Sequence, residues 1–489
     1  MSGKTKFTDY EPLNRPEDSR KKLPENLEGF QPRNTAALLL EEEPVLEAPD
    51  VDRPKDPPKP SLDKERLFWK LPKGGHGLTF VGLFLFTVVL YIRPYEIFPS
   101  LIWLKGIAFW IAIPTILIYI PSQLGIDQKL TFRPRQVNML LLLFFAAVLS
   151  VPLSSDRQVS WDSLTDYLKV VLMFIVFINV VRTEARLKLL LLLILIVSCV
   201  MSFAAVNDYR MGILASNGQR IKGIIGGMFD NPNDLALHLV TLIPISIGLM
   251  LSSRAVFKKL FYATCAIVLV AGVVVSFSRG GFLGLVCAGG MLGWRLMRRN
   301  KGLLLIAPLI VAAFIALAPG GYGSRLATTS DGSAETRTDD LKRSIFIAIR
   351  HPVVGVGMGN YVLFSNKEHA SHNAYTQVAS ELGIAALVFY LLFQIASIKD
   401  LREIIRETEP KGPDARYHYL AIGFEAALVG YMVCSFFASV AFLWYIYYLV
   451  GYSICLRRLY ESFAARQQQE TAPVFRPAAT HRSSLVTAG

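Results

Sequence analysis

Long runs of apolar residues alternate along the chain with short stretches that are rich in lysine and arginine. Several of these runs approach or exceed the roughly 20 residues that an α-helix needs to cross the hydrocarbon core of a bilayer. The pattern predicts an all-α polytopic membrane protein with about twelve transmembrane helices. The expected spans lie near residues 78–97, 101–120, 137–153, 166–182, 187–206, 235–252, 258–277, 281–296, 303–319, 376–398, 417–437 and 439–457.

The composition of the 489 residues agrees with this pattern. Hydrophobic residues make up 52% of the chain, charged residues make up 18%, and the mean hydropathy is +0.40, which is too apolar for an ordinary soluble domain. The cysteines lie within the apolar spans, and none has the spacing of a CxxC motif or a metal site. We therefore predict neither a disulfide framework nor a bound metal. The cysteines are Cys199, Cys265, Cys287, Cys434 and Cys455.

The two ends of the chain differ sharply from the apolar middle. Residues 1–75 are rich in proline and charged residues and cannot bury enough apolar surface to offset the entropy of ordering, so we expect a disordered tail. Residues 461–489 form a second expected tail, which leaves a helical membrane domain at 76–460. No signal peptide begins the chain, so we expect the first tail to stay in the cytoplasm.

Basic connections between the expected spans predict the orientation, because short loops rich in lysine and arginine stay cytoplasmic. Alternate connections are basic, for example "QKLTFRPRQ", "RTEARLK", "SSRAVFKK" and "WRLMRRNKG". With an even number of spans, both termini are then cytoplasmic, and a long loop at about 320–375, between the ninth and tenth helices, is external. The net charge of +13 is explained as a topology signal and an attraction to lipid headgroups, so no nucleic-acid partner is expected.

Several cations nevertheless fall on the side that is expected to be external, where the orientation rule favours few of them. A single arginine there can serve a salt bridge or a headgroup contact, but a group of them suggests a site for an anion. The members of this group are Arg210, Arg220, Lys222, Arg279, Arg325, Arg337, Lys342 and Arg343.

Three motifs accompany these cations in a fixed order. They are "QRIKGIIGGMFDNPNDLALHL", "SFSRGGFLGL", and "HPVVGVGMGNY" followed by "SHNAYTQVASELG". With these motifs, residues of about 137–457 resemble the O-antigen ligase and polymerase superfamily of bacterial envelope glycan enzymes. The resemblance implies a glycosyltransferase without metal or cofactor, with a polyprenyl diphosphate-linked glycan as donor. It also implies an active site at the external face of the bacterial inner membrane.

The donor-binding residues that the resemblance implies are Arg220 and Arg279, whose planar guanidinium groups can meet phosphate oxygens bidentately. Arg337 matches an arginine that often precedes the short loop helix of the family, and we expect it to bind the donor diphosphate, with acceptor binding as the alternative. Gly280 and Gly281 would let the backbone approach the headgroup, although glycines at such places also serve tight helix packing.

His372 is the expected catalytic residue. A sugar hydroxyl becomes a competent nucleophile when a positioned base accepts its proton, and imidazole titrates near neutral pH. The resemblance assigns the histidine of this motif to activation of the acceptor. The alternative is a loop histidine bonded to backbone, and His369 and His351 are nearby rivals for the catalytic role.

Two further residues are expected to support the site. Glu381 follows His372 on the same expected helix, where it could pair with an arginine or orient the site through a hydrogen bond. Asn233 lies in an Asn-Pro-Asn-Asp stretch that predicts a helix N-terminus, either as a cap alone or in contact with the donor. The glycine-rich "GVGMGN" lacks the preceding strand of a nucleotide loop, and we expect it to bend the loop that presents His372.

Several functions remain open at this point. A ligase would move a finished glycan to another acceptor, a polymerase would extend a lipid-linked repeat unit, and a relative could glycosylate protein. A transporter that binds an anion in transit, or a scaffold, is the alternative from another class, although the candidate groups cluster in outer loops instead of at mid-membrane. The expected partners are the lipid-linked donor, a glycan or lipid-linked acceptor, membrane lipids, and a flippase or chain-length regulator.

Overall fold

The computed structural model describes residues 75–213, 221, 229, 231–297, 332–365 and 370–471. Within these ranges the chain is helical throughout and contains no strand, which confirms the predicted fold class. The helices are α1 (Gly77–Ile92), α2 (Pro94–Ile97), η2 (Pro99–Leu104), α3 (Ile107–Asp127), α4 (Arg135–Leu153), α5 (Arg157–Val180), α6 (Glu184–Arg210), α7 (Pro232–Ser252), α8 (Val256–Val275), α9 (Arg279–Met297), α12 (Gly332–Arg350), η5 (Asn360–Phe364), α13 (Ala374–Leu382), α14 (Ile384–Glu407), α15 (Ala415–Cys434), η6 (Ser435–Phe437) and α16 (Trp444–Thr471).

Nine helices in the described part of the chain are long and apolar enough to cross a membrane. The span expected at 303–319 lies outside the described residues, so a total of about twelve stays a prediction. Helix α16 continues to Thr471, beyond the expected start of the C-terminal tail at 461.

The span expected at 376–398 is wrong as a single helix. The chain breaks at Gly383, which has φ +90° and separates α13 from α14. A side chain at this position would place its Cβ 2.4 Å from the carbonyl oxygen of Val353, so only glycine fits. The amide of Ile384 donates to the Pro352 carbonyl at 2.8 Å, which ties the break to the loop after α12. The membrane-crossing helix is therefore α14, and Glu381 belongs to the short helix that precedes it.

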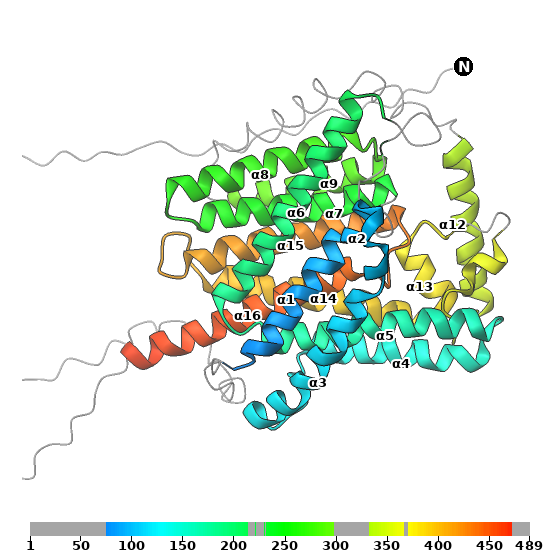
Figure 1. The fold of residues 1–489 in the computed structure, drawn as a ribbon, viewed down its shortest axis with the longest axis horizontal. Helices are drawn as coiled ribbons and strands as arrows, with labels where there is room; N and C mark the ends of the chain where they lie inside the picture. Colours follow the sequence, from blue (N-terminus) through cyan, green and yellow to red (C-terminus); the bar gives the residue numbers. More distant parts are fainter. Residues whose placement is uncertain are drawn as a thin grey trace, which may run out of the picture. The chain divides into compact units, whose positions relative to one another are not determined.

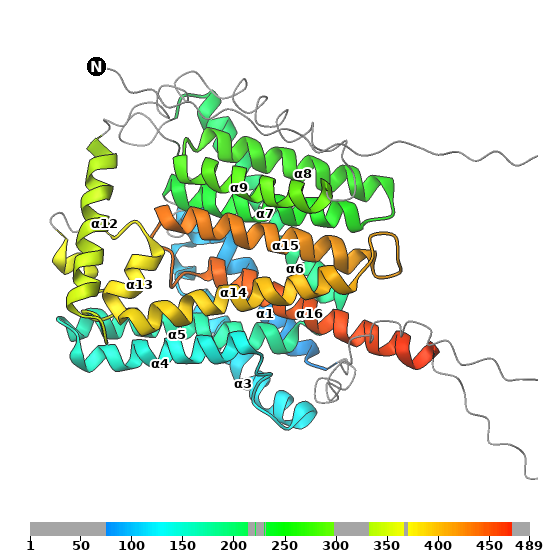
Figure 2. The ribbon, with the colours of Figure 1, turned by 180° about the vertical axis from the view of Figure 1, so that it is seen from behind.

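Helices α7 and α15 form the centre of the bundle, where α15 contacts α7, α9, α14 and α16 (Figure 2). Small residues let the backbones approach closely, as is common between membrane helices. A Cβ added to Gly423 of α15 would lie 2.7 Å from the Pro244 carbonyl oxygen of α7. A Cβ added to Gly284 of α9 would lie 3.1 Å from the Gly430 carbonyl oxygen of α15. These contacts fix α9 and α7 against the same central helix.

The connections between helices gather at the two ends of the bundle (Figure 1). We call one end the basic end, because its connections, at 128–134, 181–183, 253–255 and 408–414, carry or adjoin most of the lysines and arginines of the described loops. We call the other the site end, which contains the connections at 154–156, 276–278 and 435–443 together with α12, η5 and α13.

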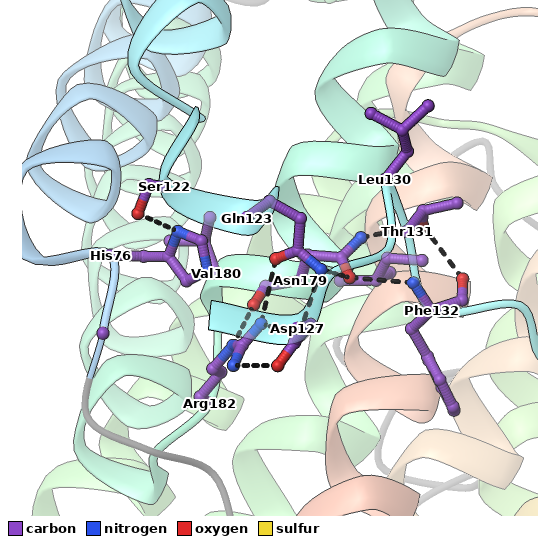
Figure 3. A network of polar contacts seen from close by, with 12 residues as sticks. His76, Ser122, Gln123, Asp127, Leu130, Thr131, Phe132, Asn179, Val180 and Arg182 are labelled. Atoms are coloured by element: carbon purple, nitrogen blue, oxygen red, sulfur yellow. Dashed lines mark hydrogen bonds and ion pairs between the residues drawn. The ribbon is translucent and has the colours of Figure 1, made fainter. Parts of the chain in front are cut away.

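The basic end is stabilised by a buried polar network around Arg182 (Figure 3). The Arg182 guanidinium pairs with Asp127 and donates to the Gln123 side-chain oxygen at 2.9 Å and to the Asn179 carbonyl at 2.6 Å. These contacts join the C-terminus of α3 to the connection between α5 and α6. The charge of Arg182 is thus compensated within the fold.

Candidate functional site

The last part of the first motif, from Asn231 onward, forms the N-terminus of α7, where the Asn231 side chain accepts from the Asn233 amide at 2.9 Å and caps the helix. Asn233 is itself buried, and its side-chain oxygen accepts from the Ser278 hydroxyl at 2.8 Å. The Ser278 hydroxyl in turn accepts from the Gly281 amide at 3.1 Å. The cap prediction is therefore confirmed, and the hydrogen bonds bring the first two motifs side by side.

Gly280 and Gly281 begin α9 and serve close packing at this point. A Cβ added to Gly281 would lie 2.6 Å from the Cβ of Ala236, and one added to Gly280 would lie 2.8 Å from the Cβ of Phe437. Of the two roles left open for these glycines, the structure shows the packing role. The packing holds Arg279, the first residue of α9, at the site end.

Arg279 and Arg337 belong to different helices but lie near enough for their charges to interact. Both side chains are half-buried, and burial together with the positive charge of Arg279 lowers the pKa of Arg337. Both causes disfavour the charged form of Arg337, and a nearby anion would favour it. Arg220, the third expected donor-binding residue, lies outside the described residues.

His372 directly precedes the N-cap of α13 and has φ +52°, in the left-handed region. Its neighbours Ser371 and Asn373 are buried, and the Asn373 side chain accepts from the amides of Tyr375 and Thr376 at 2.9 and 3.0 Å. A non-glycine residue in this conformation is strained and persists only when its surroundings hold it. The half-buried imidazole of His372 is therefore presented by an anchored segment.

The C-terminus of α15 and the connection that follows it contact both the second and the third motif. The Cys434 thiol donates to the Gly280 carbonyl at 3.4 Å, and Phe437 packs against Gly280. Two residues farther on, the Ser439 hydroxyl hydrogen-bonds with that of Ser371 at 3.2 Å. The sequence did not predict a role for this segment, because "CSFFASV" contains no charged residue and no recognisable motif.

The glycine-rich loop is a scaffold for α13. Gly355, Gly357 and Gly359 all have positive φ, at +69°, +102° and +77°. The Gly357 amide donates to the Glu381 carbonyl at 3.0 Å. At the other side of the loop, the Asn360 side-chain oxygen accepts from the Asp156 amide at 2.8 Å. These contacts fit the expected role of bending the loop that presents His372, and they agree with its rejection as a nucleotide loop.

Glu381 is buried within this scaffold, and it forms no ion pair with any arginine in the described ranges. Its Oε2 atom has no hydrogen-bond partner among the described residues. Burial raises the pKa of Glu381 to about 7, and the amides of Gly359 and Tyr361 offset part of that effect. The expected arginine partner is therefore not found in this part of the chain.

Neither rival histidine is found among the described contacts of this arrangement. His351 is exposed just after the end of α12, and His369 lies outside the described residues. In the described part of the chain, no three His, Cys, Asp or Glu side chains cluster closely enough to hold a metal ion.

Residues 264–391 match a family model described as O-antigen ligase. The matched segment contains Arg279, Arg337, His372 and Glu381, whereas no curated protein matches the chain. Members of the family are glycosyltransferase-like enzymes, ligases and polymerases, and the family implies lipid-linked glycan substrates in the membrane. The match confirms the resemblance that the motifs predicted, and it favours an enzyme over a transporter. Residues 264–391 of this integral membrane protein are therefore similar to an O-antigen ligase domain, which supports the O-antigen ligase and polymerase superfamily.

Proposed function

We propose that the protein transfers an oligo- or polysaccharide from a polyprenyl diphosphate carrier to an acceptor hydroxyl, as O-antigen ligases do, without a metal or cofactor. The observation that carries this proposal is that two half-buried arginines, Arg279 and Arg337, lie near enough at one end of a membrane bundle for their charges to interact. Two half-buried guanidinium groups in proximity suit a ligand with two phosphates.

The donor reacts by cleavage of the bond between the anomeric carbon and the diphosphate oxygen. The lipid diphosphate leaves with the electron pair, so negative charge develops on that oxygen in the transition state. Arg279 and Arg337 would stabilise this charge, with Arg220 as a third expected contact. Because both described arginines are half-buried, their interaction with the phosphates is screened less than it would be in bulk water.

The acceptor reacts through its hydroxyl oxygen, which forms the new glycosidic bond to the anomeric carbon. His372 would accept the hydroxyl proton as this bond forms and later release it to solvent. The anchored backbone on both sides of His372 supports this role, because a general base needs a fixed position relative to its substrate.

We propose that the basic end faces the cytoplasm and the site end faces the exterior of the bacterial inner membrane. The grouping of basic connections at one end supports this orientation. A cysteine in place of exposed Asp339 on α12 should react with an impermeant thiol reagent in intact spheroplasts, whereas one in place of exposed Lys411 should not. The reverse labelling would overturn the orientation.

The donor site is tested by Arg279→Lys and Arg337→Lys, which keep the charge but lose the bidentate fork. Each variant should lower transfer by about 100-fold or more, since a well-placed contact to developing charge contributes a few kcal/mol. Transfer is measured with radiolabelled lipid-linked glycan at equal membrane abundance of each variant. Arg343→Lys is the matched control on α12, because Arg343 donates to the Phe364 carbonyl and should tolerate lysine. Near wild-type transfer in both test variants would refute the diphosphate site.

A ligase and a polymerase need the same diphosphate site and the same base, so the glycan of a deletion strain separates them. Accumulation of long lipid-linked polymer, with none on the final acceptor, would identify a ligase. Accumulation of single lipid-linked repeat units would identify a polymerase.

A further inference from the structure

Helix α12 has an exposed apolar patch that no described element covers. Ile345, Phe346 and Ile349 are 44%, 51% and 70% exposed, and Val353, just after the helix, is 78% exposed. The opposite face of α12 packs against α13, with Ile347 among its buried residues. We call the four exposed residues the α12 patch. A cluster of large apolar side chains on an element that does not cross the membrane indicates a contact with something outside the described part of the chain.

The α12 patch lies at the level of the bilayer surface. Helix α12 runs across the site end, transverse to the membrane helices (Figure 1, Figure 2). The segment after it is tied to the turn between α4 and α5, because the Ser155 amide donates to the Val356 carbonyl at 3.1 Å. Both α4 and α5 are candidate membrane spans, so the turn between them marks where the chain emerges from the bilayer.

The lipid-facing surface of α4 and α5 continues up to this turn. Leu153, the last residue of α4, is 68% exposed, and Trp161, in the second turn of α5, is 56% exposed. Tryptophan is typical of the interface between hydrocarbon and headgroups. The α12 patch therefore lies close to the exposed apolar surface of two candidate membrane spans.

Cations accompany the α12 patch. Lys342 is exposed, and the Arg350 guanidinium lies 4.2 Å from the centre of the Phe346 ring. Arg343, between them, extends toward η5 and donates to the Phe364 carbonyl at 2.8 Å. Apolar side chains beside lysine and arginine are typical of helices that lie in the interface plane, where the cations reach lipid phosphates. In a symmetric contact between two copies of the chain, the same cations would face one another and repel.

We propose that the α12 patch is embedded in the phospholipid headgroup region of the membrane at the site end. The contact would hold α12 parallel to the bilayer and would set the depth of Arg337, which lies on the same helix two to three turns before the patch. Any lipid-linked phosphate at that depth would then meet Arg337 without movement of the helix. The proposal rests on exposure, position and charge, and it does not depend on the proposed transfer reaction.

The test places the photo-reactive residue p-benzoylphenylalanine at Phe346 in the full chain and irradiates intact membranes. Phe203, which is 71% exposed on the membrane helix α6, is the positive control, and Lys411 at the basic end is the solvent-exposed control. Mass spectrometry of the labelled peptides should show phospholipid adducts at 346 and 203 and none at 411. A cross-linked dimer from position 346 would assign the patch to a second copy, and a foreign protein would assign it to a partner. Either result, or no lipid adduct at 346 when one forms at 203, would overturn the proposal.

Discussion

The two ends of the bundle differ in the surroundings of their arginines. At the basic end, Arg182 is fully buried and is surrounded by a carboxylate, an amide oxygen and a carbonyl, so its charge is compensated by the protein (Figure 3). At the site end, Arg337 lies beside another cation, Arg279, and both burial and that charge lower its pKa. A cation that the fold compensates contributes to structure, whereas we propose that the two cations at the site end bind the donor diphosphate.

The largest expected effect concerns the base at the site end. Asparagine tolerates the left-handed backbone of His372 but cannot accept a proton at neutral pH, so His372→Asn should keep the fold and lose transfer by about 100-fold to 10,000-fold. Wild-type activity should also fall on acidification as the imidazole becomes protonated. The residual activity of the variant should not show this fall. Transfer and donor binding are measured on purified protein with labelled lipid-linked glycan.

If His372→Asn binds the donor as well as wild type but does not transfer the glycan, His372 acts as the general base. His372→Ala is the comparison, because alanine in the left-handed region adds backbone strain. Substantial transfer by His372→Asn would show that the residue only anchors its loop.

At the basic end, Arg182→Gln should affect stability instead of chemistry. The variant removes the buried donor of the Gln123 side-chain oxygen and of the Asn179 carbonyl, which is expected to cost about 1–3 kcal/mol of unfolding free energy. Thermal denaturation in detergent should show the loss, while transfer per folded molecule stays near wild type. Lys169→Gln is the control, because its ion pair with Asp166 is exposed and should contribute less than about 1 kcal/mol. If Arg182→Gln lost transfer but not stability, the assignment of a structural role to the basic end and a chemical role to the site end would be wrong.

A pH effect on stability is expected from Glu381. Its pKa is raised from 4.5 to about 7 in the folded state, so folding favours the protonated form. Stability should therefore decline as the pH rises from about 4.5 to about 7 and then level off, by at most roughly 3 kcal/mol. In Glu381→Gln this slope should disappear, as measured by unfolding at a series of pH values. The exposed Glu409→Gln should keep the slope, and an unchanged slope in Glu381→Gln would contradict the assignment.

The smallest effect is expected at the packed start of α9. In Gly281→Ala the new methyl group would meet Ala236 at 2.6 Å, and overpacking of this kind costs about 1–3 kcal/mol. Gly289→Ala on the same helix meets nothing within 4 Å and should be neutral or slightly stabilising. Denaturation of both variants under identical conditions checks the difference. Equal stability of the two would show that α9 can shift without cost, and Arg279 would then not be held in place.

The sequence was most informative where the signal is local. Hydropathy predicted the helical class and most described spans to within several residues, because burial in lipid requires an unbroken apolar run. The Asn-Pro-Asn-Asp stretch predicted the start of α7, since capping involves only neighbouring residues. Hydropathy did not separate α13 from α14, because the break depends on the contact of Gly383 with Val353.

The sequence by itself determined which residues of the candidate site carry charge and in which order they occur, and the motif order was enough to predict the family. Only the tertiary structure decided that Arg279 lies near Arg337 and that the 434–439 segment separates the second and third motifs. The physical reason is that these relations depend on how α7, α9 and α15 approach through their glycines. Such contacts join residues far apart in the chain, and they leave no periodic or compositional trace in any one segment.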